Sequence, residues 1–136
     1  MTTSVHKSVV VAGGKATATI TFGGVPAADE TIVIVDAAGT SKTYTAKAGT
    51  TAGSLEFTRG GTAAAAATAL KLCMDNAAGH NGTITVVDSG AGVLTLTQTV
   101  AGPEGNAGNA FGSWTGITDG LANVTTVDFA GGTIAE

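Results

Sequence analysis

The feature that most constrains the fold of this chain is a strict two-residue alternation of apolar and threonine side chains. In residues 15–22 (KATATITF), Ala, Ile and Phe alternate with Thr, and residues 93–99 (VLTLTQT) repeat the pattern far along the chain. Successive side chains of a β-strand point to opposite faces of a sheet. The alternation therefore predicts half-buried strands that turn their apolar residues inward and their threonines outward.

Further strands are predicted from β-branched runs that lie between turn residues. Residues 31–36 (TIVIVD) are apolar on both faces, which indicates a central strand. A hairpin loop at residues 37–40 leads into a returning strand at residues 41–47, with Tyr44 at its middle. The remaining strands are expected at residues 55–58, 83–88 and 122–129, and residues 89–92 form a second hairpin loop.

One segment, residues 63–78, has helical periodicity and is rich in alanine. Thr62 precedes it as an N-cap, and Gly79 follows at the position of a left-handed C-terminal cap. The face expected to be buried consists of Ala66, Leu70, Cys73, Met74 and Ala77. The order of elements predicts an α+β fold, a mostly antiparallel β-sheet or sandwich with one Ala-rich helix packed on it.

A length of 136 residues is typical of a single domain. We expect residues 1–14 to form an N-terminal arm and residues 15–136 to form one β-rich domain. The arm contains Val9, Val10 and Val11, followed by a glycine pair that predicts a hinge. Such an arm can add as a strand to the edge of a neighbouring sheet, so these valines are candidate partner-binding residues.

Charge and hydropathy argue against two classes of partner. The net charge is −4, and the six Lys and Arg residues form no cluster, so no binding to nucleic acid is expected. Residues 63–78 are too short to span a bilayer, and the N-terminus lacks the apolar core of a signal peptide. We expect no membrane partner and a chain that is made and assembled in the cytoplasm.

No pattern in the sequence indicates catalysis, a cofactor or a metal site. His6 and His80 stand alone without further ligands at zinc spacing. Asp29, Glu30 and Asp36 are interpreted as solvated turn carboxylates rather than calcium ligands. A serine nucleophile elbow is missing as well, so we expect no enzyme and no catalytic, cofactor-binding or metal-binding residues. The single cysteine is expected to be a small buried hydrophobic residue.

The glycine-rich loop at residues 102–108 lacks the features of a phosphate-binding loop. Such a loop needs a following helix N-terminus and usually a lysine, whereas this one follows a strand and contains Glu104. We therefore interpret it as a structural loop. Its Gly and Asn residues are expected to take positive φ, and its Asn amides to bond the backbone.

Four segments occur in an order that resembles a known family. They are TIVIVD with its hairpin, TAAAAATALKLCMDNAAG, VLTLTQTVAGPEGNAGN and VTTVDFAGG. In this order they resemble a small β-rich structural module of tailed-bacteriophage virion proteins, found in capsid- and tail-associated components, and the resemblance extends over roughly residues 15–133. The resemblance implies a structural role in the virion. The FGSW segment at residues 111–114 departs from the pattern.

The function expected from this resemblance is that of a capsid decoration (cement) protein that binds and stabilises the assembled phage head. Its partners would be the major capsid protein or other virion proteins, with self-association. Phe111 and Trp114 are candidate aromatic anchors for a partner, or else they cap the domain's own core. The alternatives are a tail tube or fibre component and a carbohydrate-binding adhesion module, although an adhesin would expose more aromatic residues.

Overall fold

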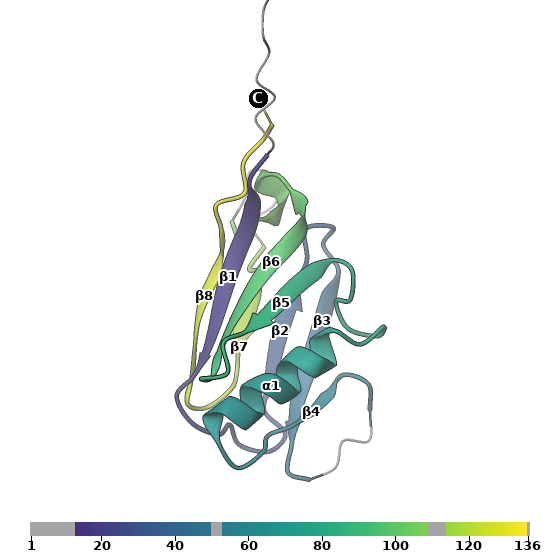
Figure 1. Cartoon of the computed structure of the whole chain (residues 1–136). Coiled ribbons are helices and arrows are strands. Elements are labelled where there is room, and N and C mark those ends of the chain that lie inside the picture. The colour runs from purple at the N-terminus through teal and green to yellow at the C-terminus, as the bar shows by residue number, and fades with distance from the viewer. Residues whose placement is uncertain (1–12, 50–52, 109–113, 136) are drawn as a thin grey trace, which may run out of the picture.

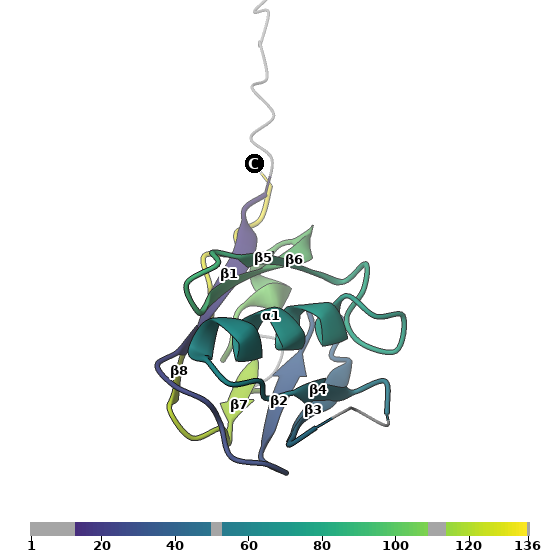
Figure 2. The same ribbon diagram turned by 60° about the horizontal axis from the view of Figure 1, so that its bottom comes forward.

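Two four-stranded β-sheets lie face to face in the computed structural model, which describes residues 13–49, 53–108 and 114–135 (Figures 1 and 2). Sheet A has the strand order β5-β6-β1-β8, and sheet B has the order β4-β3-β2-β7. The strands of sheet A are β5 (Ile84–Asp88), β6 (Val93–Ala101), β1 (Lys15–Phe22) and β8 (Val124–Ala130). Those of sheet B are β4 (Glu56–Thr58), β3 (Ser41–Lys47), β2 (Thr31–Val35) and β7 (Ile117–Asp119).

The strand pairing is antiparallel with one exception. Sheet A is antiparallel throughout, as are the pairs that β2 makes with β3 and β7. The exception is β4, which runs parallel to β3 at the edge of sheet B. The mostly antiparallel α+β fold expected from the sequence is confirmed. The central strand predicted at residues 31–36 is the interior strand β2, which ends one residue earlier, at Val35.

The core fills the space between the sheets, and it is built from the alternating residues of the strands. On β1 the inward residues Ala16, Ala18, Ile20 and Phe22 are all buried, as the alternation predicted. Leu94 and Leu96 of β6 lie beside them. Sheet B contributes Ile32, Ile34, Tyr44, Ala46 and Phe57.

The helix α1 (Ala63–Met74) packs against β4 of sheet B and against β5, β6 and β1 of sheet A. Figure 2 shows it lying between the two layers, so it closes one side of the sandwich. The hydroxyl of Thr62 accepts the N–H of Ala65 at 3.1 Å, which confirms the predicted N-cap. The buried helix residues are Ala66, Ala67, Leu70, Cys73 and Met74.

The C-terminal end of the helix differs from the prediction. The helix ends at Met74 rather than at residue 78, and Ala77 is exposed. Gly79 is not a left-handed cap: a Cβ there would lie 2.6 Å from the carbonyl oxygen of Cys73 and 2.7 Å from that of Met74. The chain turns back onto the helix end, where His80 donates its N–H to the Met74 carbonyl at 2.9 Å. Glycine is therefore needed at position 79 for close approach, not for φ.

Strand β7 was not predicted, because three residues between glycines carry too short a pattern. It is placed by non-local bonds, since Val35 donates to Gly116 and Gly120 donates to Thr31.

At the opposite end of the chain, Gly14 already belongs to the folded domain. Its carbonyl accepts the N–H groups of Gly102 and Thr133 at 3.0 Å each, and its own N–H donates to the Thr133 hydroxyl. Residues 14 and 131–135 thus lie side by side (Figure 1).

Candidate binding surface

The outward side of sheet A carries a row of four side chains that crosses all its strands. In this row Val87 pairs with Thr95, Thr95 pairs with Thr19, and Thr19 pairs with Val127. The two valines are 59% and 65% exposed. Because every pair is in register, the row has the order Val-Thr-Thr-Val from either edge of the sheet.

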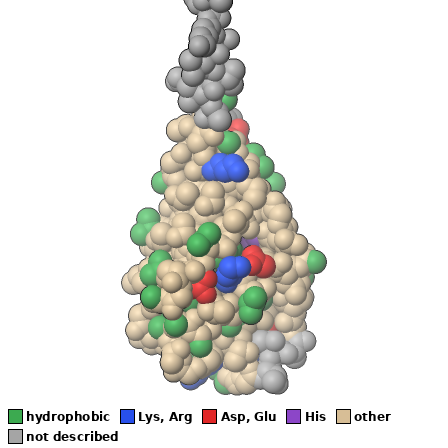
Figure 3. Space-filling model, viewed as in Figure 1, with side chains coloured by type: hydrophobic (Ala, Val, Ile, Leu, Met, Phe, Trp, Pro, Cys, Tyr) green, Lys and Arg blue, Asp and Glu red, His purple; other side chains and the backbone are tan. Residues whose placement is uncertain are grey.

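Two neighbouring rows extend this surface, which we call the threonine–valine face. One consists of Thr85, Thr97, Thr17 and Ala130, and the other of Val93, Thr21 and Thr125. None of the residues in the three rows is charged, and Lys15 lies beyond them at the start of β1. Figure 3 looks onto this side of the molecule, where other side chains and backbone (tan) cover most of the surface, with scattered hydrophobic side chains and a small group of acidic and basic side chains near the middle of the view.

The outward side of sheet B has a different character. Lys47 of β3 forms ion pairs there with Asp29 at 2.6 Å and with Glu56 at 3.9 Å. The hydrogen bond and the charge of Asp29 raise the pKa of Lys47. The two outer faces are therefore distinguished by charge: the rows of sheet A contain no ion pair, whereas a partner on sheet B would desolvate those of Lys47. The Lys71–Asp75 pair belongs to α1 and not to these rows.

The predicted partner-binding residues are only partly described. Val9, Val10, Val11 and Phe111 lie outside the described residues. Trp114 is half-buried, its carbonyl accepts the N–H of Gly108 at 3.0 Å, and a Cβ on Gly116 would lie 3.1 Å from its ring. The ring thus lies against Gly116, just before β7, and its role as an anchor stays a prediction.

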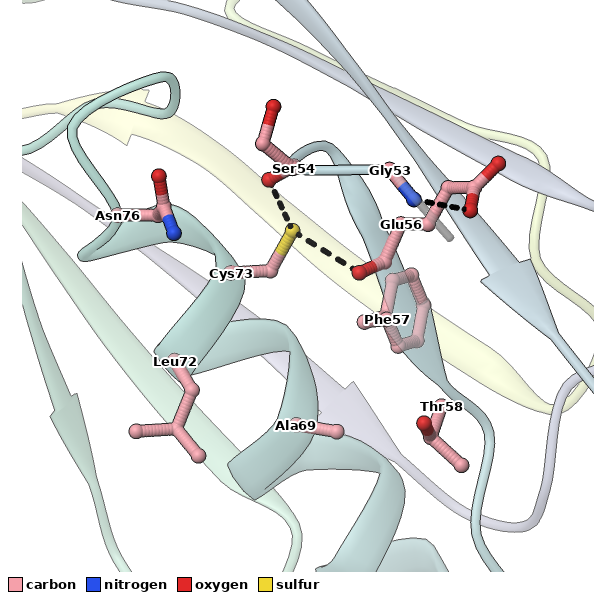
Figure 4. A pocket seen from close by; sticks show the side chains of 9 residues that line it. All are labelled: Gly53, Ser54, Glu56, Phe57, Thr58, Ala69, Leu72, Cys73 and Asn76. Carbon is pink, nitrogen blue, oxygen red and sulfur yellow. Dashed lines mark hydrogen bonds between the residues drawn. The ribbon is translucent and has the colours of Figure 1, made fainter. Parts of the chain in front are cut away.

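A shallow groove of about 270 Å³ lies between β4 and α1 (Figure 4). The Cys73 thiol lies within it and donates to the carbonyls of Ser54 and Glu56 at 3.4 and 3.5 Å. Burial raises the pKa of the Cys73 thiol to about 11, and the negative charge of Glu56 contributes to the rise. The thiol therefore stays protonated at neutral pH. The prediction of a small buried cysteine is confirmed: it attaches the helix to β4.

His80 is also a structural residue. Its Nε2 lies 3.2 Å from the Thr40 carbonyl, which can only accept, so Nε2 carries the proton. Its Nδ1 then accepts the hydroxyl of Tyr44 at 2.7 Å. Burial lowers the pKa of His80 and raises that of Tyr44, which keeps both groups neutral. The pair fixes the loop after the helix to sheet B.

Gln98 joins the two sheets, a role that was not anticipated from the sequence. From β6 its fully buried side chain accepts the N–H of Ala37 at 3.0 Å and donates to the carbonyl of Val35 at 3.3 Å. Its position was indicated by the alternation of residues 93–99, which places it on the inward face with Leu94 and Leu96. A polar residue at such a position needs partners in the opposite layer.

The interpretation of Asp36 as a solvated turn carboxylate was wrong. Asp36 is only 2% exposed, and its Oδ1 accepts the N–H groups of Ala38 and Thr40 at 3.0 and 2.9 Å. Asp36 continues the inward series of Ile32 and Ile34, so its carboxylate lies inside the hairpin and accepts the turn amides there. Glu30 likewise bonds to backbone, accepting from Ala27 at 2.9 Å and from Ala122 at 2.6 Å.

The glycine-rich loop is a structural element, as expected. It contains a short 3-10 helix η1 (Pro103–Gly105), with Gly102 and Gly108 at positive φ. Asn106 has φ −78, contrary to the expectation for the loop asparagines. Its side-chain amide, however, bonds both the carbonyl and the N–H of Gly132, at 2.9 and 2.8 Å. The loop is thereby attached to the C-terminal segment.

Across the described ranges, no three His, Cys, Asp or Glu side chains converge as metal ligands would. The helix in this part of the chain is not long and apolar enough to cross a membrane. Comparison of the chain with protein-family models, with curated proteins and with solved structures found no match.

Proposed function

We propose that this chain is a structural protein of a tailed-phage virion, and that it decorates the outside of the assembled head. The ordered segments that resemble the virion module support this assignment. The observation that carries it is the threonine–valine face, because an exposed, uncharged sheet face has the chemistry of a surface that a neighbouring virion subunit covers, whether that subunit belongs to the shell or is another copy of this chain.

The energetics of that face favour contact with protein over contact with water. The cores of protein interfaces are depleted of charged residues, and covering exposed valines gains about 25 cal/mol per Å² of apolar surface. Thr hydroxyls donate and accept, so a partner can satisfy them without burying a charge. The row with Val87 and Val127 at its ends offers both contributions.

The sandwich also suits a protein that attaches to a completed shell. Its core is formed by its own two sheets and helix, with the sheets joined through Gln98. A domain of this kind folds before it binds, and it reinforces the shell by bridging what it touches.

Localisation on particles tests this proposal. Gold-labelled antibody against the protein would be applied to purified particles of the phage that encodes it, with antibody against the major capsid protein as the positive control. We expect label distributed over the heads. Label confined to tails would assign the protein to the tail tube or fibres, and lack of label on intact particles would contradict a role in the virion. Binding of the purified protein to polysaccharide instead would favour the adhesion module.

A further inference from the structure

We propose that the threonine–valine face pairs with the same face of a second copy of this chain. The inference rests on the proposed function, because it names an occupant for the same surface, and it leaves attachment to the head to other parts of the molecule. The contact is isologous, with a two-fold axis that runs parallel to the strands between β6 and β1.

The order of the central row supports this symmetry. A two-fold axis between β6 and β1 places Val87 opposite Val127 of the second copy, and Thr95 opposite Thr19 of the second copy. Each exposed valine then meets an exposed valine, and each Thr hydroxyl meets another hydroxyl. The row is thus complementary to itself, which is the requirement for an isologous contact.

The distribution of charge favours the same pairing. Each copy has a net charge of −4, so the repulsion between two copies is smallest where the surfaces that meet carry no acidic groups. The threonine–valine face meets this condition, and Lys15 stays at its rim. Pairing through the outer face of sheet B would instead desolvate the ion pairs of Lys47 with Asp29 and Glu56.

The size of the face sets the strength of the contact. Four strands about 4.8 Å apart, with about five residues of 3.3 Å each, give a footprint of roughly 300 Å². Stable complexes bury about 800 Å² on each partner. We therefore expect a weak dimer, with a Kd between about 10 μM and 1 mM. Copies held close together on one shell would pair more completely, because their effective concentration is high.

Sedimentation equilibrium of the purified full chain over about 10 μM to 1 mM tests the proposal, since this range brackets the expected Kd. We expect the wild-type chain to dimerise in this range. Thr95→Lys and Thr19→Glu should each remain monomeric, because each homodimer would bury unpaired charges. A mixture of these two variants should recover association, because the axis places residue 95 of one copy opposite residue 19 of the other.

The matched control is Thr43→Lys, an exposed threonine on the interior strand β3 of sheet B, which should dimerise like the wild type. Circular dichroism would confirm that all variants are folded. A wild-type chain that is monomeric at 1 mM overturns the proposal, as does equal loss of dimer in Thr43→Lys. Failure of the mixture to associate would refute the axis. Gold labelling of heads is a separate measurement. If the chain stays monomeric in solution but antibody against it still labels the heads, only the pairing is refuted and the proposed function stands.

Discussion

Replacement of Gln98 by methionine tests how the two sheets are held together. Methionine has a similar length and volume but no amide, so the N–H of Ala37 and the carbonyl of Val35 would lose their bonds to this side chain. Leaving a buried polar group unsatisfied costs about 1–3 kcal/mol, and two are affected here. Burial of the apolar methionine returns about 1.5–3 kcal/mol. The net loss in the free energy of unfolding is expected to be about 2 kcal/mol.

For a domain of this length, 2 kcal/mol corresponds to a fall in Tm of roughly 6–10 °C. Differential scanning calorimetry and urea unfolding followed by circular dichroism would measure both quantities. Thr43→Met is the control, because it places the same side chain on an exposed position of sheet B and should change stability by less than about 0.5 kcal/mol. A Gln98→Met protein that melts within 2 °C of the wild type would refute the assigned bridge, with the 6–10 °C expectation as reference.

Three further changes probe the rest of the fold. Leu70→Ala should lower the free energy of unfolding in urea by about 3–5 kcal/mol, because Leu70 is fully buried. Leu72 is 66% exposed, so Leu72→Ala should lower it by less than about 0.5 kcal/mol. Equal losses would contradict the helix orientation. The pKa of His80 is lowered in the fold, so the unfolded chain takes up its proton first, near pH 6.5. The free energy of unfolding should therefore fall as the pH drops below about 6.5, by at most about 1.4 kcal/mol per pH unit. His80→Gln should remove this dependence on pH. If the variant keeps the same dependence, another group causes it. Gly79→Ala should lower Tm, because its Cβ would meet two backbone carbonyls, whereas an unchanged Tm would mean that the chain after the helix can move away.

The parts of the fold that the sequence predicted correctly depend on local patterns. The two-residue period of β1 predicts which of its side chains enter the core. The structure buries the predicted residues, which are Ala16, Ala18, Ile20 and Phe22. Thr62 caps the helix through a bond to a residue three positions away, so the signal and its effect lie in the same short segment. Such features need no knowledge of the rest of the chain.

The features that were missed or wrong depend on residues distant in the sequence. Strand β7 exists because β2 offers it a partner, about eighty residues earlier in the chain. The helix ends at Met74 because the following residues turn back onto its last carbonyls, which helical periodicity does not record. Asp36 is buried under its hairpin turn, where its carboxylate accepts the N–H groups of Ala38 and Thr40. In each case tertiary contacts outweighed a weak local signal.

The outward half of the strand pattern carries information that the inward half does not. The inward residues of a sandwich are mostly apolar in any such fold, with Gln98 a bonded exception here, whereas the outward ones are free to be Lys, Glu or Thr. On sheet B that freedom supplies Lys47 and Glu56, while the rows of sheet A use none of the chain's charged residues. An exposed, uncharged sheet face that ends in valines invites association, and soluble proteins usually interrupt it with charge. Its persistence over four strands is therefore best explained by a partner that covers it, and the Thr95→Lys and Thr19→Glu mixture shows directly whether that partner is the same chain.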